Sequence, residues 1–301
     1  MRCRLRARFD EWSGEMGLLD RQGVFLPYLH LLGASYDEPP GYSFEERVSA
    51  ASRDDVLGIG FDADEFDKLL ESNSVEDLRG ILDQYGVTIG ELQILFAWHF
   101  GGDYQKMARE REEHMYDLCD LFGIPRIKTV IMTPTELPGP DLLVERFAGV
   151  CDRAAARGIS VAMEPQSVNP GFDYADTVDM LLAANRPNGG LVVDAWHFFR
   201  DPDAFTQIDR LPAASIFNLE LRDAAAEPKG SRLDDCLHHN LMPGEGDFDL
   251  VRLIRTLDAK GVDIPISAEV LSADLRAHTA AENVARTVDS VAVLMDAARA
   301  R

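Results

Sequence analysis

Four acidic residues end four consecutive apolar segments in the second half of the chain. They are the last or next-to-last residues of ISVAME, GLVVD, SIFNLEL and PISAE, namely Glu164, Asp194, Glu220 and Glu269. If these segments are parallel strands, their carboxyl ends meet at one edge and the side chains converge. Four anions in a partly buried cup repel one another strongly unless a cation lies among them. Mg²⁺ or Mn²⁺, which prefer oxygen ligands, is the simplest such cation.

These residues also have a simpler interpretation. Any one of the four acids, taken singly, could equally cap a helix or face solvent, and only their shared position favours a common site. His197 follows Asp194 by three residues. Beside a candidate ligand it could be a metal neighbour or a hydrogen-bond donor to substrate, although a histidine among aromatic residues could also serve only in packing.

The elements that would position these residues follow a regular pattern. From about residue 23, short apolar runs alternate with amphipathic stretches, which is typical of parallel βα units. Strands are predicted over residues 23–32, 56–61, 88–98, 126–132, 159–164, 190–194, 215–221 and 265–269. Helices are predicted over residues 43–53, 74–85, 104–122, 140–157, 173–185, 202–209, 248–260 and 273–301. Eight such pairs favour a single-domain α/β fold, the (β/α)₈ TIM barrel, over a doubly wound open sheet.

Two segments depart from this pattern. Residues 1–22 precede the first strand and are expected to form an N-terminal arm, either loosely ordered or packed on a neighbouring subunit, so that residues 23–301 form the TIM-barrel domain. Residues 222–247 form a long connection on the face where barrel active sites lie. Connections of this length are usually functional or disordered.

Composition restricts the class of protein. The 301 residues include 30 basic and 52 acidic side chains, a net charge of −22, which disfavours binding to nucleic acid or to anionic membranes. Four scattered cysteines suit reduced thiols, and the sequence offers neither a membrane-length apolar run nor a secretory signal. A cytoplasmic protein is therefore expected.

Five segments in order resemble the motifs of the xylose-isomerase-like TIM-barrel superfamily, the sugar phosphate isomerase/epimerase family. They are GISVAMEP (158–165), LVVDAWH (191–197), LELRDA (219–224), PGEGDFD (243–249) and ISAEV (266–270). The resemblance extends over about residues 23 to 298. Each motif is weak alone, but the ordered set is fairly specific for the superfamily and is not specific for a reaction.

The resemblance implies one divalent ion, Mn²⁺, Mg²⁺ or Co²⁺, bound by the acids that end strands five to eight. Glu164, Asp194 and Glu269 match the family pattern directly, whereas Glu220 stands where many members have His or Gln. A fourth carboxylate makes the site more anionic, which disfavours Zn²⁺ and favours Mn²⁺ or Mg²⁺.

A second departure concerns recognition of the substrate. Many members have an Arg shortly before the Pro-Gly-Glu-Gly motif, where this chain has Asn240. Losing that guanidinium argues against a phosphate or carboxylate of the substrate held at that point. Arg222 or Arg232 could take its place.

The activity implied by the resemblance is a metal-dependent isomerase or epimerase of carbohydrate metabolism, acting on a polyol or keto-sugar. Proton transfer would pass through a metal-stabilised enediolate, with Glu164 and Glu269 as acid and base and His197 fixing a substrate oxygen. The pocket would be walled by aromatic side chains, which could instead serve only in packing: Trp98, His99, Trp196 and Phe198. Members of the family are often homodimers or homotetramers.

Several alternatives stay open. The same enolate chemistry permits elimination, so a dehydratase of the inosose or dehydroshikimate type competes, as does an internal hydride shift. The departures at Glu220 and Asn240 also fit a degenerate, non-catalytic barrel subunit. Apurinic endonucleases share this barrel, but their trinuclear zinc site is rich in histidines, and seven scattered histidines on this acidic chain do not supply one.

Overall fold

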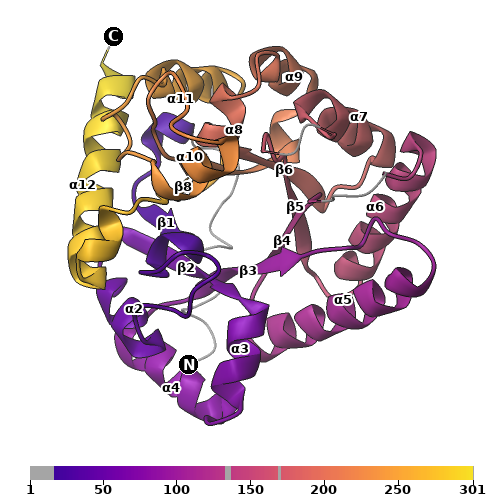
Figure 1. Cartoon of the computed structure of the whole chain (residues 1–301), viewed down its shortest axis with the longest axis horizontal. Helices are drawn as coiled ribbons and strands as arrows, with labels where there is room; N and C mark the ends of the chain where they lie inside the picture. Colours follow the sequence, from indigo (N-terminus) through magenta and orange to yellow (C-terminus); the bar gives the residue numbers. More distant parts are fainter. Residues whose placement is uncertain (1–16, 133–136, 169–170, 301) are drawn as a thin grey trace. The chain divides into compact units, whose positions relative to one another are not determined.

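Eight parallel strands close into a barrel in chain order, which confirms the predicted fold (Figure 1). The structure is a computed structural model that describes residues 17–132, 137–168 and 171–300. The strands are β1 (Val24–Leu26), β2 (Val56–Asp62), β3 (Ile89–Leu95), β4 (Arg126–Val130), β5 (Ser160–Glu164), β6 (Gly189–Asp194), β7 (Ile216–Leu221) and β8 (Ile266–Ala268).

Helices alternate with these strands. In the described residues they are α2 (Phe44–Ala50), α3 (Ala63–Leu70), α4 (Val75–Tyr85), α5 (Asp103–Phe122), α6 (Pro140–Ala155), α7 (Tyr174–Ala184), α8 (Ala195–Phe199), α9 (Ala204–Arg210), α10 (Arg232–His238), α11 (Leu250–Ala259) and α12 (Ala280–Arg299). Among the described helices none is both long and apolar enough to cross a membrane.

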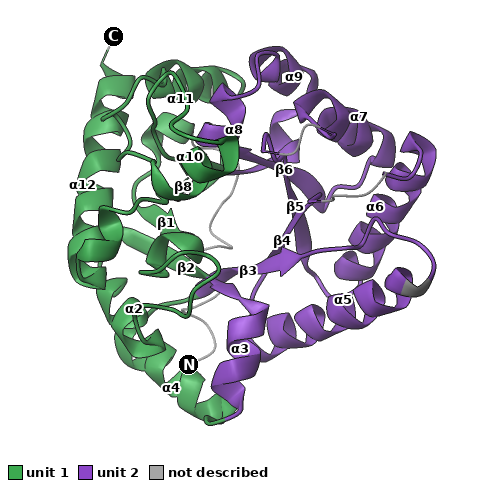
Figure 2. Cartoon of the chain, viewed as in Figure 1, with its two compact units in different colours: residues 1–60, 72–88, 219–301 green, residues 61–71, 89–218 purple. Residues whose placement is uncertain are grey.

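The chain divides into two compact units (Figure 2). Unit 1 comprises residues 1–60, 72–88 and 219–301, and unit 2 comprises residues 61–71 and 89–218. Unit 2 carries β3 to β6 and the first half of β7, with helices α5 to α7 packed beside the strands, whereas unit 1 carries β1, most of β2, the second half of β7 and β8.

The strand register in unit 2 fixes which residues stand side by side. β4 pairs with β5 so that Val130 lies opposite Glu164, and β5 pairs with β6 through Met163 and Leu191. Their apolar residues are almost all buried, which is expected of parallel strands covered on both faces. The register therefore brings the carboxyl ends of β5 and β6 together inside this unit.

Unit 1 includes the described part of the predicted N-terminal arm. Residues 18–20 form a 3₁₀ turn with Leu18 fully buried, and the Leu19 amide donates a hydrogen bond to Asp258 Oδ1 at 3.0 Å. The Arg299 side chain donates to the Leu19 carbonyl at 2.7 Å. Residues 17–22 are thus attached to α11 and α12, and residues 1–16 lie outside the described part of the chain.

Element boundaries differ from the predicted ones at both ends of the barrel domain. The first strand ends at Leu26 instead of residue 32 because Pro27 follows, which has no N–H for the ladder. The last helix starts at Ala280 instead of residue 273 because Thr279 and Glu282 form a capping box there.

Three short helices were not predicted: α3, α8 and α10. Each begins after a side chain that accepts hydrogen bonds from the first-turn amides, from Asp62, Asp194 and Ser231 respectively. Such capping stabilises a helix too short to show helical periodicity in sequence.

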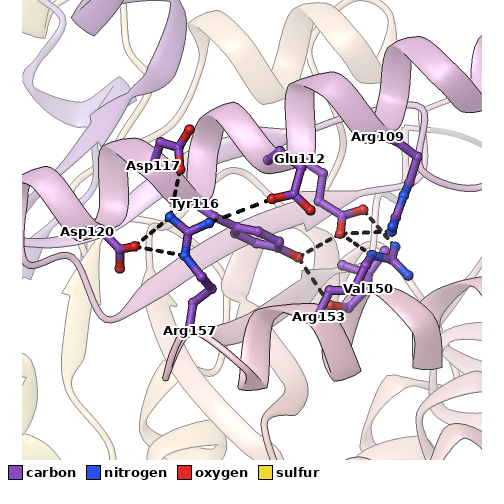
Figure 3. A network of polar contacts seen from close by, with 9 residues as sticks. Arg109, Glu112, Tyr116, Asp117, Asp120, Val150, Arg153 and Arg157 are labelled. Carbon is purple, nitrogen blue, oxygen red and sulfur yellow. Dashed lines mark hydrogen bonds and ion pairs between the residues drawn. The ribbon is translucent and has the colours of Figure 1, made fainter.

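An ionic network around the buried Glu112 joins α5 to α6 in unit 2 (Figure 3). The Glu112 carboxylate accepts hydrogen bonds from Arg153 Nε and Nη2 at 2.5 and 2.8 Å, and Arg109 and the Tyr116 hydroxyl also contact it. Burial raises the pKa of Glu112 to about 7, against the opposing effect of Arg109.

This shift predicts how stability changes with pH. A carboxyl group whose pKa rises from 4.5 to about 7 on folding keeps its proton in the folded state up to about pH 7. Its stabilising contribution is therefore complete below pH 4.5 and is lost as the pH rises through 7. At about 1.4 kcal/mol per pH unit, this amounts to at most about 3 kcal/mol. We expect the free energy of unfolding of wild type, minus that of Glu112→Gln, to fall by this amount between pH 5 and 8.

Urea denaturation of both proteins at several pH values measures the difference. The control is Glu113→Gln, which removes a carboxylate that is about half exposed on the same helix. A difference between wild type and Glu112→Gln that stays constant with pH would contradict the prediction.

Candidate metal centre

The carboxyl ends of β5 and β6 bring three potential metal ligands together in unit 2. One ligand atom each from Glu164, Asp194 and His197 lies within 4.8 Å of the others, and all three residues are buried. Oxygen ligands bound to one divalent ion at about 2.0 to 2.6 Å lie at roughly such separations. The spacing and the carboxylate-rich donor set therefore fit a divalent metal ion.

The Asp194-x-x-His197 spacing has a local cause. β6 ends at Asp194, and its Oδ1 accepts a hydrogen bond from the His197 amide at 2.9 Å, so that Asp194 is the N-cap of α8. This single turn of helix returns His197 to the side of the residue that caps it. Asp194 thus both starts the helix and lies in the candidate site.

His197 is held in one tautomer. Its Nδ1 accepts a hydrogen bond from the Ser167 amide at 3.1 Å, and the Ser167 hydroxyl donates to the His197 carbonyl at 2.6 Å. Because Nδ1 acts as acceptor, the proton of the neutral ring lies on Nε2. Nε2 lies 3.8 Å from Glu164 Oε1. This arrangement suits a hydrogen-bond donor better than a metal ligand, which would need the lone pair of Nε2.

Two buried cationic side chains, those of Lys128 and Arg126, are linked to Glu164 by a series of ion pairs. The sequence analysis identified neither of them. Lys128 Nζ lies 3.7 Å from Glu164 Oε2 and 3.8 Å from Glu91 Oε1. Arg126 Nε lies 2.8 Å from Glu91 Oε2. The available signal was the presence of charged residues at every second position in otherwise apolar strands, as in Arg-Ile-Lys of β4.

Glu220 and Glu269 are described within unit 1. Glu220 lies opposite Ser267 in the β7–β8 register, and the Glu269 amide donates to the Leu221 carbonyl at 3.2 Å. Both side chains are buried, with exposed fractions of 0% and 3%. Because Ser267 and Glu269 are two residues apart, Glu220 and Glu269 lie on the same face of this strand pair.

Three other polar residues that the sequence analysis associated with substrate recognition lie in unit 1, where Arg222 and Asn240 connect two loops. Arg222 is buried and its Nη1 donates to Asn240 Oδ1 at 3.2 Å, and Asn240 Oδ1 also accepts from the Leu271 amide at 3.0 Å. Arg232 is exposed at the start of α10. The contact of Arg222 or Arg232 with a substrate stays a prediction.

The predicted aromatic wall is buried in packing contacts. The ring of Trp98 lies 5.6 Å from those of His99 and Phe147, and Trp196 lies edge-on to His197 at 5.1 Å. Burial, assisted by the charge of Arg146, lowers the pKa of His99 to about 4, so this ring is neutral. A role of Trp98, His99 or Trp196 in substrate binding stays a prediction.

Comparisons with known proteins name two activities. The chain is 26% identical over 254 residues to a 3-dehydroshikimate dehydratase of Pseudomonas aeruginosa, which covers 81% of this chain and 39% of that protein. It is 26% identical over 194 residues to an inosose isomerase of Bacillus licheniformis, covering 60% of this chain and 68% of that protein. The chain thus spans about two fifths of the dehydratase's length.

Solved structures agree on the fold. The crystal structure of the IOLI protein with a bound zinc atom superposes with a TM-score of 0.79 at 15% identity, covering 93% of this chain and all of that one (100%). A family model for the xylose isomerase-like TIM barrel matches residues 54–295, which is most of the chain. The chain belongs to the xylose isomerase-like TIM barrel family.

Proposed function

We propose that this protein is a divalent-metal-dependent enzyme that moves a proton beside the carbonyl group of a polyhydroxylated compound, as an isomerase or epimerase. One observation carries the proposal: two buried carboxylates, Glu164 and Asp194, lie beside a histidine whose Nε2–H is directed by the Ser167 amide. Enolisation of a hydroxy-carbonyl compound requires a base that removes the proton and groups that stabilise the negative charge on the carbonyl oxygen. Carboxylates, a divalent metal ion and a fixed hydrogen-bond donor can meet these needs.

The proposed ligand set includes two further acids. Parallel barrel strands all end at the same mouth, and β7 and β8 follow β6 in the barrel order. We therefore assign Glu220 and Glu269 to the same ion as Glu164 and Asp194, a candidate set of four buried acids. Such a set of oxygen ligands favours Mn²⁺ or Mg²⁺ over softer ions.

The residues of the chain divide the chemistry among them. A divalent ion bound here would supply Lewis-acid polarisation of the carbonyl. Glu164 or Glu269 takes the proton from the neighbouring carbon, the C–H electron pair becomes part of a C=C bond, and negative charge moves to the carbonyl oxygen. For epimerisation the other glutamate returns a proton to the opposite face of the same carbon. For isomerisation it protonates the former carbonyl carbon, while the hydroxyl proton of the neighbouring carbon passes to the former carbonyl oxygen. His197 Nε2–H donates to a substrate oxygen and fixes its position.

Elimination is the second candidate reaction, and the similarity to the 3-dehydroshikimate dehydratase over 81% of this chain favours it. It begins with the same proton removal, but the electron pair of the enolate then expels the hydroxyl group of the adjacent carbon, which takes a proton from the other glutamate and leaves as water. The inosose isomerase similarity favours proton return instead. Both reactions share this proton removal, which we assign to Glu164 or Glu269.

Turnover in D₂O distinguishes the two reactions and the hydride shift. Isomerisation by proton transfer incorporates deuterium at carbon, a hydride shift does not, and elimination yields a product lighter by one water. A non-catalytic barrel would show neither turnover of hydroxy-carbonyl compounds nor binding of Mn²⁺ by titration calorimetry. A homodimer or homotetramer and a cytoplasmic location stay predictions.

Replacement of the proposed acid or base should remove turnover. In Glu269→Gln the side chain keeps its size, but the amide can neither accept a proton nor carry the ligand charge. We expect kcat to fall by at least about a hundredfold, while the far-ultraviolet circular dichroism stays that of wild type. Glu227→Gln, at an exposed position of the loop after β7, is the control. Unchanged kcat in Glu269→Gln would remove this residue from the mechanism.

Asp194 allows the metal role to be separated from the capping role. In Asp194→Asn the amide oxygen still accepts from the His197 amide, whereas Asp194→Ala loses both the cap and the carboxylate. We expect the Asn variant to exceed the Ala variant in free energy of unfolding by about 1 kcal/mol when metal is removed. Both should bind Mn²⁺ at least about tenfold more weakly than wild type. Wild-type Mn²⁺ affinity in the Asn variant would show that Asp194 is not a ligand.

A further inference from the structure

A row of four buried charges runs through the strands of unit 2, from Arg126 to Glu91 to Lys128 to Glu164. The sign alternates along the row, and neighbouring charged atoms lie 2.8, 3.8 and 3.7 Å apart. The exposed fraction of these residues is between 1% and 8%. Isolated charges this deep would be strongly destabilising, so the alternation is a condition for burying any of them.

The row is anchored at its far end and stops at the candidate site. Arg126 Nη1 donates to the Phe217 carbonyl at 2.8 Å. Lys128 lies opposite Ala162 in the β4–β5 register, two residues before the pair formed by Val130 and Glu164. Its side chain therefore starts one step below Glu164 on the same face and reaches up to it.

The two oxygens of Glu164 have different neighbours. Oε2 lies beside the Lys128 ammonium at 3.7 Å, and Oε1 lies beside His197 Nε2 at 3.8 Å. Oε1 thus lies beside the ring that Ser167 and Asp194 position. A cation at Oε2 competes directly with any second cation for that oxygen.

We propose that Lys128 is a positioning residue that reserves Oε2 of Glu164, so that this carboxylate can offer a metal ion Oε1 alone. The inference rests on the proposed function, in which Glu164 is a ligand of the ion. With the ammonium in place, Glu164 cannot close on the ion with both oxygens, so Oε1 keeps the orientation that turnover requires. Glu91 holds the ammonium from the opposite side, and Arg126 balances the charge of Glu91.

The proposal predicts opposite changes in two measured quantities. Lys128→Met keeps the length of the side chain and removes the competing charge. Because two cations no longer share Glu164, Mn²⁺ should bind about tenfold more tightly. Glu164 then turns both oxygens toward the ion and loses its orientation, so kcat should fall by at least about tenfold, with little change in KM. Damage to the fold alone would weaken metal binding and turnover together.

A second variant guards against misfolding. Lys128→Met removes one positive charge, so that Arg126 alone faces the two carboxylates of Glu91 and Glu164. The double variant Glu91→Gln with Lys128→Met keeps only the opposite charges of Arg126 and Glu164, so the row stays neutral. We expect the double variant to show the same tighter binding of Mn²⁺ and the same lower kcat. Lys106→Met, which removes an exposed lysine of α5, controls for the loss of one positive charge.

Titration calorimetry with Mn²⁺ alone, together with steady-state kinetics, gives the answer. Tighter binding with lower kcat in the double variant supports the proposal. Unchanged or weaker Mn²⁺ binding in a folded double variant overturns it, even if wild type binds Mn²⁺ and turns over substrate. A wild-type protein that binds no Mn²⁺ overturns the proposed function and the role of Lys128 with it.

Discussion

The constraint on which this site depends is the cost of burying carboxylates. Glu164 and Asp194 are 4% and 0% exposed, so each needs a partner that replaces water. For Asp194 the partner is the His197 amide, and for Glu164 it is the Lys128 ammonium with His197 nearby. Groups of the protein therefore neutralise part of the negative charge of these carboxylates, for which the sequence analysis had invoked a metal ion alone. A metal ion at this site must compete with these partners as well as join them.

Much of the architecture could be predicted because it depends on local patterns. Apolar runs of strand length, separated by amphipathic segments, indicated all eight strands. The helices predicted from residues 43 and 74 do begin there, because Ser43 and Ser74 form capping boxes. Helix α8 escaped prediction because its five residues are too few to show a period, and its start depends on a residue singled out as a ligand. The acids at the ends of β5 and β6 were predicted because strand ends can be read from sequence.

The residues that escaped prediction depend on contacts between distant parts of the chain. Ser167 sets the tautomer of His197 across 30 positions, and nothing in either local sequence indicates this contact. In the sequence, Lys128 is one charged residue of a short strand. Its contacts depend on Glu91 of β3 and Glu164 of β5 lying on either side of it. Pairing and register decide such contacts, whereas local patterns decide only that a strand exists.

The reaction class is harder to assign than the fold because isomerases and dehydratases of this kind share their first half. Removing a proton beside a carbonyl needs a base, stabilisation of the enolate and a fixed donor, and under the proposed function the residues around Glu164 contribute to these in either reaction. What separates the reactions is the next event, proton return to carbon or loss of a hydroxyl group. That choice depends on the second acid and on the groups that orient the leaving hydroxyl. Under the proposed function, these are Glu269 and its neighbours, close to Asn240, where the sequence departs from the pattern that the resemblance implies. Under the proposed function, the departure at Asn240 therefore lies near the acid on which the choice of reaction depends.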